Sequence, residues 1–131
     1  MGDALTERAQ AAQQRAYARY SDFPVGAAVE ADDGRVFDGV NVENAASPVA
    51  ICAERVAVGT AVTAGVRHLV RVVVATNAHP PSAPCGACRQ VLAEFANDDL
   101  IIDAVGPQGH RRWTLGELLP HRFGPKDLES T

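Results

Sequence analysis

The chain has 131 residues, which fits one domain because ordinary domains contain roughly 100–200 residues. Hydrophobic residues make up 47% of it and charged residues 21%, so the composition supplies a core and argues against a disordered or collagen-like chain. The formal charge of −4 gives no overall attraction to nucleic acid or to anionic lipid, and we expect neither as a partner.

The sequence also lacks the marks of membrane insertion and secretion. No apolar run approaches the roughly 18 residues of a membrane span, and the first ten residues are charged where a secretory signal would be apolar. We therefore expect a cytoplasmic protein. Its three cysteines are an odd number in a chain large enough to fold without disulfides, so a disulfide framework explains them poorly.

The first half of the chain predicts a helix, a hairpin and a second helix. Apolar residues recur at steps of three and four over 4–17, as in an amphipathic helix that packs on a sheet. Segments 25–31 and 35–42 predict two strands, joined by a tight turn in which Gly34 can take a positive φ. Ser47-Pro48 is typical of a helix start and Gly65 of a helix end, so we predict a helix over 48–64.

The second half alternates strands and helices. Segments 69–76 and 100–105 are continuously apolar, as central strands covered on both faces would be, and 85–96 predicts a helix between them that Ser82 caps. A strand, helix and strand of this length favour a parallel pair. A short fifth strand over 110–114 and a helical turn over 115–119 complete the chain. The sequence thus predicts an α/β fold, a three-layer α/β/α sandwich with a central mixed five-stranded sheet, as one domain over 1–131.

Three cysteines have the spacing of metal ligands. Cys85 and Cys88 form a C-x-x-C pair that can hold one tetrahedral ion, and Cys52, near the start of another helix, can add a third thiolate. Helix N-termini aimed at the same point would lower the pKa values of these thiols. Three protein ligands leave a fourth position open, as in catalytic zinc sites. We predict one Zn²⁺ per chain, preferred over iron because thiolates are soft ligands.

The two residues after Ala53 suit chemistry at such an ion. Glu54 can lie beside the open coordination position without binding the ion, where a proton shuttle belongs. Three thiolates make the site negative, so we predict that Arg55 donates a hydrogen bond to one ligand sulfur, with Arg89 as a second candidate. A water held at the open position and a carboxyl group that moves its protons are the components of a hydrolytic deamination.

With these motifs, the chain resembles the small homotetrameric cytidine deaminases. It carries C-A-E at 52–54 in place of the H-x-E of related deaminases, P-C-x-x-C at 84–88, YSDFPVGAA at 20–28, GVNVENA at 39–45 and LLP at 118–120. The resemblance covers most of the chain. It implies a zinc-dependent enzyme that converts cytidine and 2′-deoxycytidine to uridine and 2′-deoxyuridine with release of ammonia, the chemistry of zinc deaminases in general.

The resemblance also implies a set of substrate contacts. Phe23 would pack against the nucleoside, Asn41 and Glu43 would hydrogen-bond the ribose, and the backbone N–H of Ala53 would hold the pyrimidine carbonyl. Phe123 would reach into the pocket of a neighbouring subunit of a homotetramer. The chain departs from the family at Ser47-Pro48, where an aromatic and a small residue are usual, and at 18–21, where the usual segment is X-Pro-Tyr-Ser.

Other interpretations of these residues stay open at this level. The cysteines could be buried apolar side chains, and Cys85 with Cys88 could be a redox pair, although a redox pair leaves Cys52 beside Glu54 unexplained. Asn41 could bond local backbone, as asparagine readily does. A deaminase of another aminated nucleoside, such as a blasticidin S-type antibiotic, a polynucleotide-editing enzyme and a non-catalytic zinc-binding module are the alternative functions.

Overall fold

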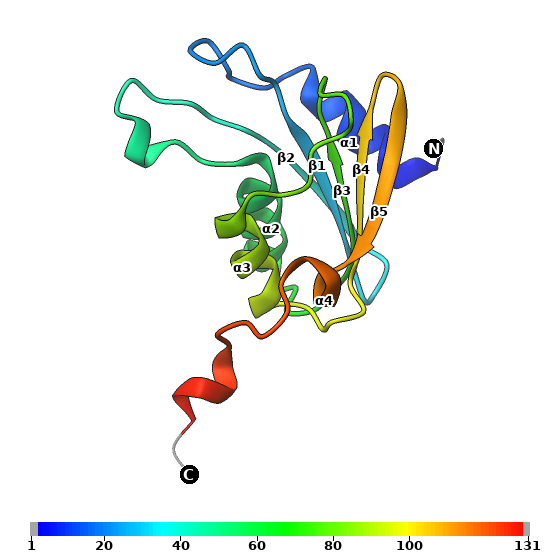
Figure 1. The fold of residues 1–131 in the computed structure, drawn as a ribbon, viewed down its shortest axis with the longest axis vertical. Helices are drawn as coiled ribbons and strands as arrows, with labels where there is room; N and C mark the ends of the chain where they lie inside the picture. The colour runs from blue at the N-terminus through cyan, green and yellow to red at the C-terminus, as the bar shows by residue number, and fades with distance from the viewer. Residues whose placement is uncertain (1–2, 130–131) are drawn as a thin grey trace.

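The computed structural model describes residues 3–129 and is built around a five-stranded sheet in the order β2-β1-β3-β4-β5 (Figure 1). The strands β3 and β4 run parallel, and every other neighbouring pair is antiparallel. The predicted mixed sheet with its one parallel pair is therefore confirmed. Its strands are β1 (Gly26–Ala31), β2 (Val36–Val40), β3 (Leu69–Ala75), β4 (Ile101–Gly106) and β5 (Gly109–Thr114).

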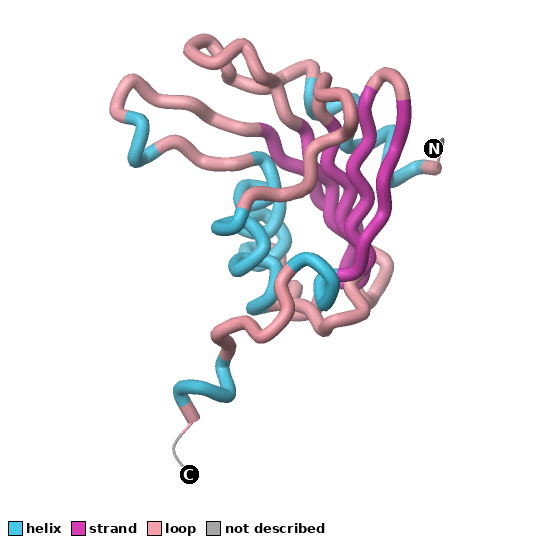
Figure 2. The backbone as a smooth tube through the Cα atoms, viewed as in Figure 1, coloured by secondary structure: helices cyan, strands magenta, loops and turns pink. Residues whose placement is uncertain are grey.

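Helices cover both faces of this sheet, which confirms the predicted three layers. One face carries α1 (Ala4–Gln13), and the other carries α2 (Ala53–Thr63) and α3 (Gly86–Glu94), as Figure 1 shows. The short α4 (Leu115–Leu118) follows β5, and two 3-10 turns lie at Ser47–Val49 and Pro125–Leu128. Figure 2 shows that the loops after α1, β2 and β3 gather at one end of the sheet. None of the helices in residues 3–129 has the length and apolar character needed to cross a bilayer.

Alternation along the strands divides the core into two clusters, as expected for a period of two residues. The larger cluster fills the space under α2 and α3, and the smaller one lies under α1. The strand residues of the larger cluster are Ala27, Val29, Ala31, Leu69, Val72, Val74 and Ile102. The smaller cluster contains Leu5, Ala9, Ala28, Val73, Ala75 and Val105.

Two glycines let helices touch the sheet backbone directly. A Cβ atom on Gly26 would lie 2.1 Å from the carbonyl oxygen of Ala9 in α1, and one on Gly39 would lie 2.4 Å from the nitrogen of Ala57 in α2. Neither position has room for a larger residue. The glycines thus set how closely each helix layer approaches β1 and β2.

The predicted helix over 48–64 is wrong in its first turn. Ser47 and Pro48 begin only a 3-10 turn, and α2 starts at Ala53. The reason is a non-local pairing, because Val42 and Ile51 exchange two backbone hydrogen bonds of 2.9 and 3.0 Å and so hold Ile51 extended. The prediction that Ser82 caps the next helix is also wrong, because Cys85 is the residue that directly precedes α3.

The first helix is shorter than the predicted 4–17. It ends at Gln13, and Tyr17 instead pairs with the strand-like segment after β2, donating its N–H to the carbonyl of Asn41 and accepting from the N–H of Glu43. This pairing ties the loop after α1 to the loop after β2. Both loops therefore lie at the end of the sheet where the cysteines are found.

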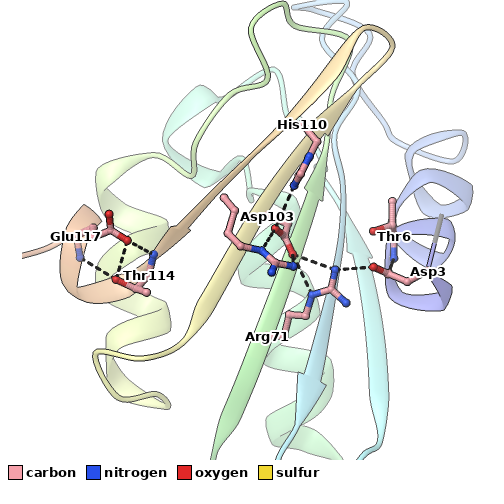
Figure 3. A network of polar contacts seen from close by, with 8 residues as sticks. Asp3, Thr6, Arg71, Asp103, His110, Thr114 and Glu117 are labelled. Carbon is pink, nitrogen blue, oxygen red and sulfur yellow. Dashed lines mark hydrogen bonds and ion pairs between the residues drawn. The ribbon is translucent and has the colours of Figure 1, made fainter. Parts of the chain in front are cut away.

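Charged residues fill part of the α1 face (Figure 3). The carboxylate of Asp103 in β4 has no exposed surface and accepts hydrogen bonds from Arg112 at 2.7 Å and from Arg71 at 2.9 Å. Arg71 also binds Asp3, the N-cap residue of α1, at 2.8 Å. Burial favours a raised pKa for Asp103, but the hydrogen bonds from the two guanidinium groups outweigh it and lower that pKa. The network joins α1 to β3, β4 and β5.

Candidate metal centre

Three cysteine sulfurs converge between the starts of two helices. Cys52 precedes α2, Cys85 precedes α3, and Cys88 lies in the first turn of α3. The Sγ atoms of Cys52 and Cys85 are 3.9 Å apart, those of Cys85 and Cys88 are 3.4 Å apart, and all three lie within 4.8 Å of one another. Tetrahedral zinc with Zn–S bonds of about 2.3 Å separates its sulfurs by roughly 3.8 Å. The three thiols therefore fit one such ion with little movement.

The local backbone explains why these residues face one another. Cys52 and Cys85 are extended, with ψ angles of 151° and 167°, and each is the last residue before its helix. The unpaired N–H groups of a helical first turn and the helix dipole place partial positive charge near such residues. Neither cysteine uses its side chain as a hydrogen-bonding cap, so the sulfurs are available to a ligand.

The three thiols differ in their acidity. Burial raises the pKa of Cys52, and burial together with the carboxyl of Glu54 raises the pKa of Cys88. At Cys85 burial also favours a higher pKa, but hydrogen bonds from the backbone N–H of Cys88 and from the neighbouring thiols outweigh it and lower the pKa. A bound cation would compensate the cost of keeping the buried sulfurs as thiolates.

Glu54 is buried beside the cysteines. It lies in the first turn of α2 with 5% of its surface exposed, and burial raises the pKa of its carboxyl. A carboxyl group with a raised pKa holds a proton more readily, which suits a group that accepts a proton and later donates it. Its position next to the sulfurs gives the site an acid–base group.

A cavity of about 250 Å³ opens beside the sulfurs. This volume lies below the roughly 300–1,000 Å³ of sites for drug-sized ligands, which suits a small ring. Six residues singled out from the sequence line it: Phe23, Asn41, Cys52, Ala53, Glu54 and Cys85. Sequence reasoning missed five others, Val25, Val74, Thr76, Ser82 and Ala83, of which Val74 and Thr76 could have been found only from their position at the end of a central strand.

Comparisons with known proteins bear on this site. Residues 2–104 match the family model described as the cytidine and deoxycytidylate deaminase zinc-binding region. The chain belongs to the cytidine deaminase family. A cytidine deaminase from Sporosarcina psychrophila is 42% identical over 125 residues, which cover 95% of this chain and 92% of the relative. One from Mycobacterium tuberculosis is 42% identical over 124 residues, with 95% and 90% covered.

A solved structure agrees with these relatives. The crystal structure of cytidine deaminase from Burkholderia pseudomallei matches with a TM-score of 0.88 and 46% sequence identity. The match covers 94% of this chain and all of that one. The similarity to cytidine deaminases therefore extends over nearly the full length of this chain, including the segments that carry the thiols and the cavity.

Not every residue expected from the cytidine deaminase family lines the cavity. Glu43 is not among the lining residues; its carboxylate accepts hydrogen bonds from the N–H groups of Tyr20 and Ser21 at 2.9 and 3.1 Å and from the Ser21 hydroxyl. Phe123 is 60% exposed and lies on the C-terminal segment, which extends away from the sheet in Figure 1. The structure therefore brings neither side chain to the cavity of its own chain.

Two arginines were expected to donate a hydrogen bond to a ligand sulfur. Arg55 is exposed on α2 beside Ile51 and Val56, and within residues 3–129 no hydrogen bond joins it to a cysteine sulfur. Arg89 donates to the backbone carbonyls of Pro84 at 2.8 Å and Leu118 at 2.9 Å. Arg89 thus anchors the segment before Cys85 to α4, and the predicted role of Arg55 stays a prediction.

Proposed function

We propose that the protein catalyses the hydrolytic deamination of cytidine and 2′-deoxycytidine to uridine and 2′-deoxyuridine, with release of ammonia, as a step of pyrimidine salvage. One observation carries this proposal, the convergence of three thiols and the buried Glu54 carboxyl at one end of a small cavity. The curated relatives that share more than 40% of their residues with this chain are named cytidine deaminases, which supports the substrate.

We assign one Zn²⁺ per chain to Cys52, Cys85 and Cys88. The distances between the sulfurs support this assignment, as does the preference of soft thiolates for zinc. Zinc with three protein ligands supplies Lewis acidity that makes water nucleophilic near neutral pH. The remaining chemistry belongs to the side chains around it.

Glu54 is the proton shuttle of the proposed reaction. Its carboxylate takes a proton from the attacking water and delivers it to the ring nitrogen N3, while the water oxygen adds to C4 of the pyrimidine. It then passes the second water proton to the amino group, the C4–N bond breaks, ammonia leaves, and a carbonyl forms at C4. The burial of Glu54, which raises its pKa, supports this double role.

Four residues of the same chain would hold the nucleoside. Phe23 packs against it, and the backbone N–H of Ala53 binds the pyrimidine carbonyl; both line the cavity. Asn41, which lines the cavity, and Glu43 bind the ribose hydroxyls. Glu43 lies outside the lining but is joined to it, because it binds the hydroxyl of Ser21, which accepts a hydrogen bond from the N–H of the lining residue Phe23. A carboxylate has about four lone-pair positions, so Glu43 can accept from a ribose hydroxyl while it keeps its bonds to the loop at Tyr20.

We further propose that the active form is a homotetramer in the cytoplasm. Large apolar side chains at Val49, Ile51 and Phe123 are exposed, which supports burial against further copies of the chain, with Phe123 entering a neighbour's pocket. Cysteines that lie close together without a disulfide support a reducing compartment. The net charge of −4 supports a small nucleoside, with neither nucleic acid nor membrane as a partner.

Arg55 is proposed to moderate the negative charge of the three thiolates. Its position directly after Glu54 on α2 supports this role, which needs the guanidinium to turn toward a sulfur once the ion is bound. Arg55→Ala would then weaken zinc binding by about 10–100-fold, as loss of groups around a metal site commonly does.

The proposed function is tested with purified protein and its Glu54→Gln variant. The wild type should contain one zinc per chain and should convert cytidine. The conversion is measured as the decrease in the ultraviolet absorbance of cytidine. Glu54→Gln should keep the zinc and lose turnover by about 100–10,000-fold, the usual contribution of general acid–base catalysis. Glu94→Gln, at an exposed glutamate on α3, is the matched control and should behave as the wild type.

A substrate panel separates the alternatives. Turnover of a blasticidin S-type antibiotic without turnover of cytidine would assign the chain to another aminated nucleoside. Zinc content without binding of any nucleoside or hydrated-pyrimidine analogue would identify a non-catalytic zinc module. Retained turnover in Glu54→Gln would disprove the role of that carboxyl.

A further inference from the structure

Gln13, at the end of α1, is a buried amide on the side of the sheet opposite the cysteines. Only 8% of its surface is exposed. Its Nε2 group donates two hydrogen bonds, one of 3.2 Å to the carbonyl oxygen of Pro24 and one of 3.0 Å to Oδ1 of Asn77. Both partners belong to loops at the end of the sheet where the cavity lies. Gln13 is therefore a link between α1 and two of the cavity's loops.

The close packing of α1 explains how Gln13 reaches these loops. A Cβ on Gly26 would lie 2.5 Å from the nitrogen of Gln13 and 2.1 Å from the carbonyl oxygen of Ala9, so the helix rests on the β1 backbone itself. Pro24 is only two residues before Gly26. Because the helix end is fixed over the start of β1, a side chain of glutamine length spans the distance to the Pro24 carbonyl.

The two acceptors belong to two walls of the cavity. Pro24 lies between Phe23 and Val25, both of which line it, and Asn77 directly follows Thr76, which also lines it. Segment 23–25 has a second support, because the side chain of Asn41 donates to the carbonyl of Phe23 and accepts from the N–H of Val25, both at 2.9 Å. Gln13 thus holds the middle of a segment whose two ends are held by Asn41.

We propose that Gln13 is a positioning residue that sets where Phe23 stands against the bound nucleoside. Gln13 lies outside the cavity and acts on Phe23 through its hydrogen bond to the neighbouring Pro24. Through its second hydrogen bond, to Asn77, it also fixes the distance between the segments that carry Phe23 and Thr76. Loss of both donors leaves the Pro24 carbonyl and the Asn77 amide without their shared partner, and the two loops separate. The kinetic consequence rests on the proposed deaminase function, whereas the structural link between the loops does not.

Three variants test this role. Gln13→Leu keeps the shape and removes both donors, and Gln13→Lys keeps a long side chain that only donates. Gln14→Leu, at the exposed neighbouring glutamine, is the matched control. We expect Gln13→Leu to raise KM for cytidine roughly fivefold, the effect of about one lost hydrogen bond. Its kcat should change less than about twofold, because binding and not the chemical step is affected.

Rescue and coupling separate positioning from simple packing. If the hydrogen bonds that residue 13 donates are what matters, KM of Gln13→Lys should lie closer to the wild-type value than KM of Gln13→Leu. If residue 13 only fills space, KM of Gln13→Leu should be the closer of the two. In a Phe23→Leu background, Gln13→Leu should raise KM by less than about twofold, since residues that act through one another are not additive. A full fivefold rise in that background, or a KM unchanged by Gln13→Leu, would overturn the proposal.

Hydrogen–deuterium exchange gives a readout that needs no turnover. Gln13→Leu should speed exchange in peptides that cover segments 18–25 and 76–83, while strands β3 and β4 exchange as in the wild type and Gln14→Leu changes neither segment. Exchange in both segments that stays at the wild-type rate would refute the link. If the wild type proved unable to deaminate cytidine, faster exchange in Gln13→Leu would still support the link while the proposed function failed.

Discussion

The two faces of the sheet are closed in different ways. Under α2 and α3 the contacts are apolar, and the groups suited to chemistry stand at the N-terminal ends of those helices. On the other face, α1 covers β1, β2 and β3, while the buried carboxylate of Asp103 and its arginine partners fill the region beside it (Figure 3). Reactive groups therefore lie on one face and a charged structural network on the other.

This difference predicts that chemistry and stability can be altered separately. Substitutions near the helix starts of α2 and α3 should change metal binding and turnover, and substitutions around Asp103 should change the free energy of unfolding. Gln13 is the point where the faces meet, because it belongs to the α1 layer and contacts loops of the cavity.

The largest expected effect is at the buried metal ligand. Cys88→Ser should weaken zinc binding by more than about 100-fold, since loss of a group outside the ligand set already costs about 10–100-fold. Deamination should fall with zinc content, measured by elemental analysis and chelator competition. Ala87→Ser, at the exposed neighbour in α3, should keep both. Full zinc binding by Cys88→Ser would remove that cysteine from the proposed ligand set.

On the opposite face, Asp103→Asn should destabilise the fold by about 2–3 kcal/mol, because it removes the buried negative charge that both Arg71 and Arg112 contact. The folded-state pKa of Asp103 is lowered, so its stabilisation is complete above the ordinary carboxyl pKa of about 4 and is lost as pH falls through the lower folded value. The difference from the wild type in denaturant unfolding should therefore be largest near neutral pH and shrink below about pH 4.

Asp98→Asn is the control for this measurement. Asp98 pairs with Arg122 at the surface, with 73% of its side chain exposed, so its removal should cost less than about 1 kcal/mol. Equal losses in the two variants, or a difference for Asp103→Asn that grows in acid, would contradict the structural role given to the network.

The last prediction compares the two helix contacts, where the expected loss of stability overlaps with that of Asp103→Asn and the informative difference is the smaller one in zinc affinity. Gly39→Ala and Gly26→Ala should each cost about 1–3 kcal/mol through overpacking. Only Gly39→Ala should also weaken zinc binding, because its Cβ would lie 2.7 Å from the carbonyl oxygen of Ala53, the residue after Cys52. Gly26→Ala should keep zinc and raise KM through Gln13. Calorimetry and zinc titration measure both.

Gly109→Ala, where a Cβ meets no atom within 4 Å, is the control for overpacking. Equal zinc affinities in Gly26→Ala and Gly39→Ala would show that the helix contact at β2 does not govern the position of Cys52.

Most of the fold was predictable from the sequence because its signals are local. The hairpin turn at Gly34, the end of α2 at Gly65 and the apolar central strands follow from conformational preference and burial period, and Gly34 and Gly65 have φ angles of 90° and 97°. The C-x-x-C spacing likewise predicted that Cys85 and Cys88 lie close together.

The errors arise where distant segments pair. Ser47-Pro48 has the composition of a helix start, yet the backbone bonds between Val42 and Ile51 delay α2 to Ala53. The contact of Glu43 with Ser21 depends on a similar meeting of loops. The sequence did not predict that Gln13 is buried, because a polar residue in an amphipathic helix is expected to face solvent.

The two backbone bonds between Val42 and Ile51 close the base of a projecting loop immediately before Cys52. These bonds fix the backbone just before Cys52, so a change at the tip of the loop need not move the Cys52 sulfur. We therefore expect changes of length or composition within 45–50 to leave the position of the Cys52 sulfur unchanged.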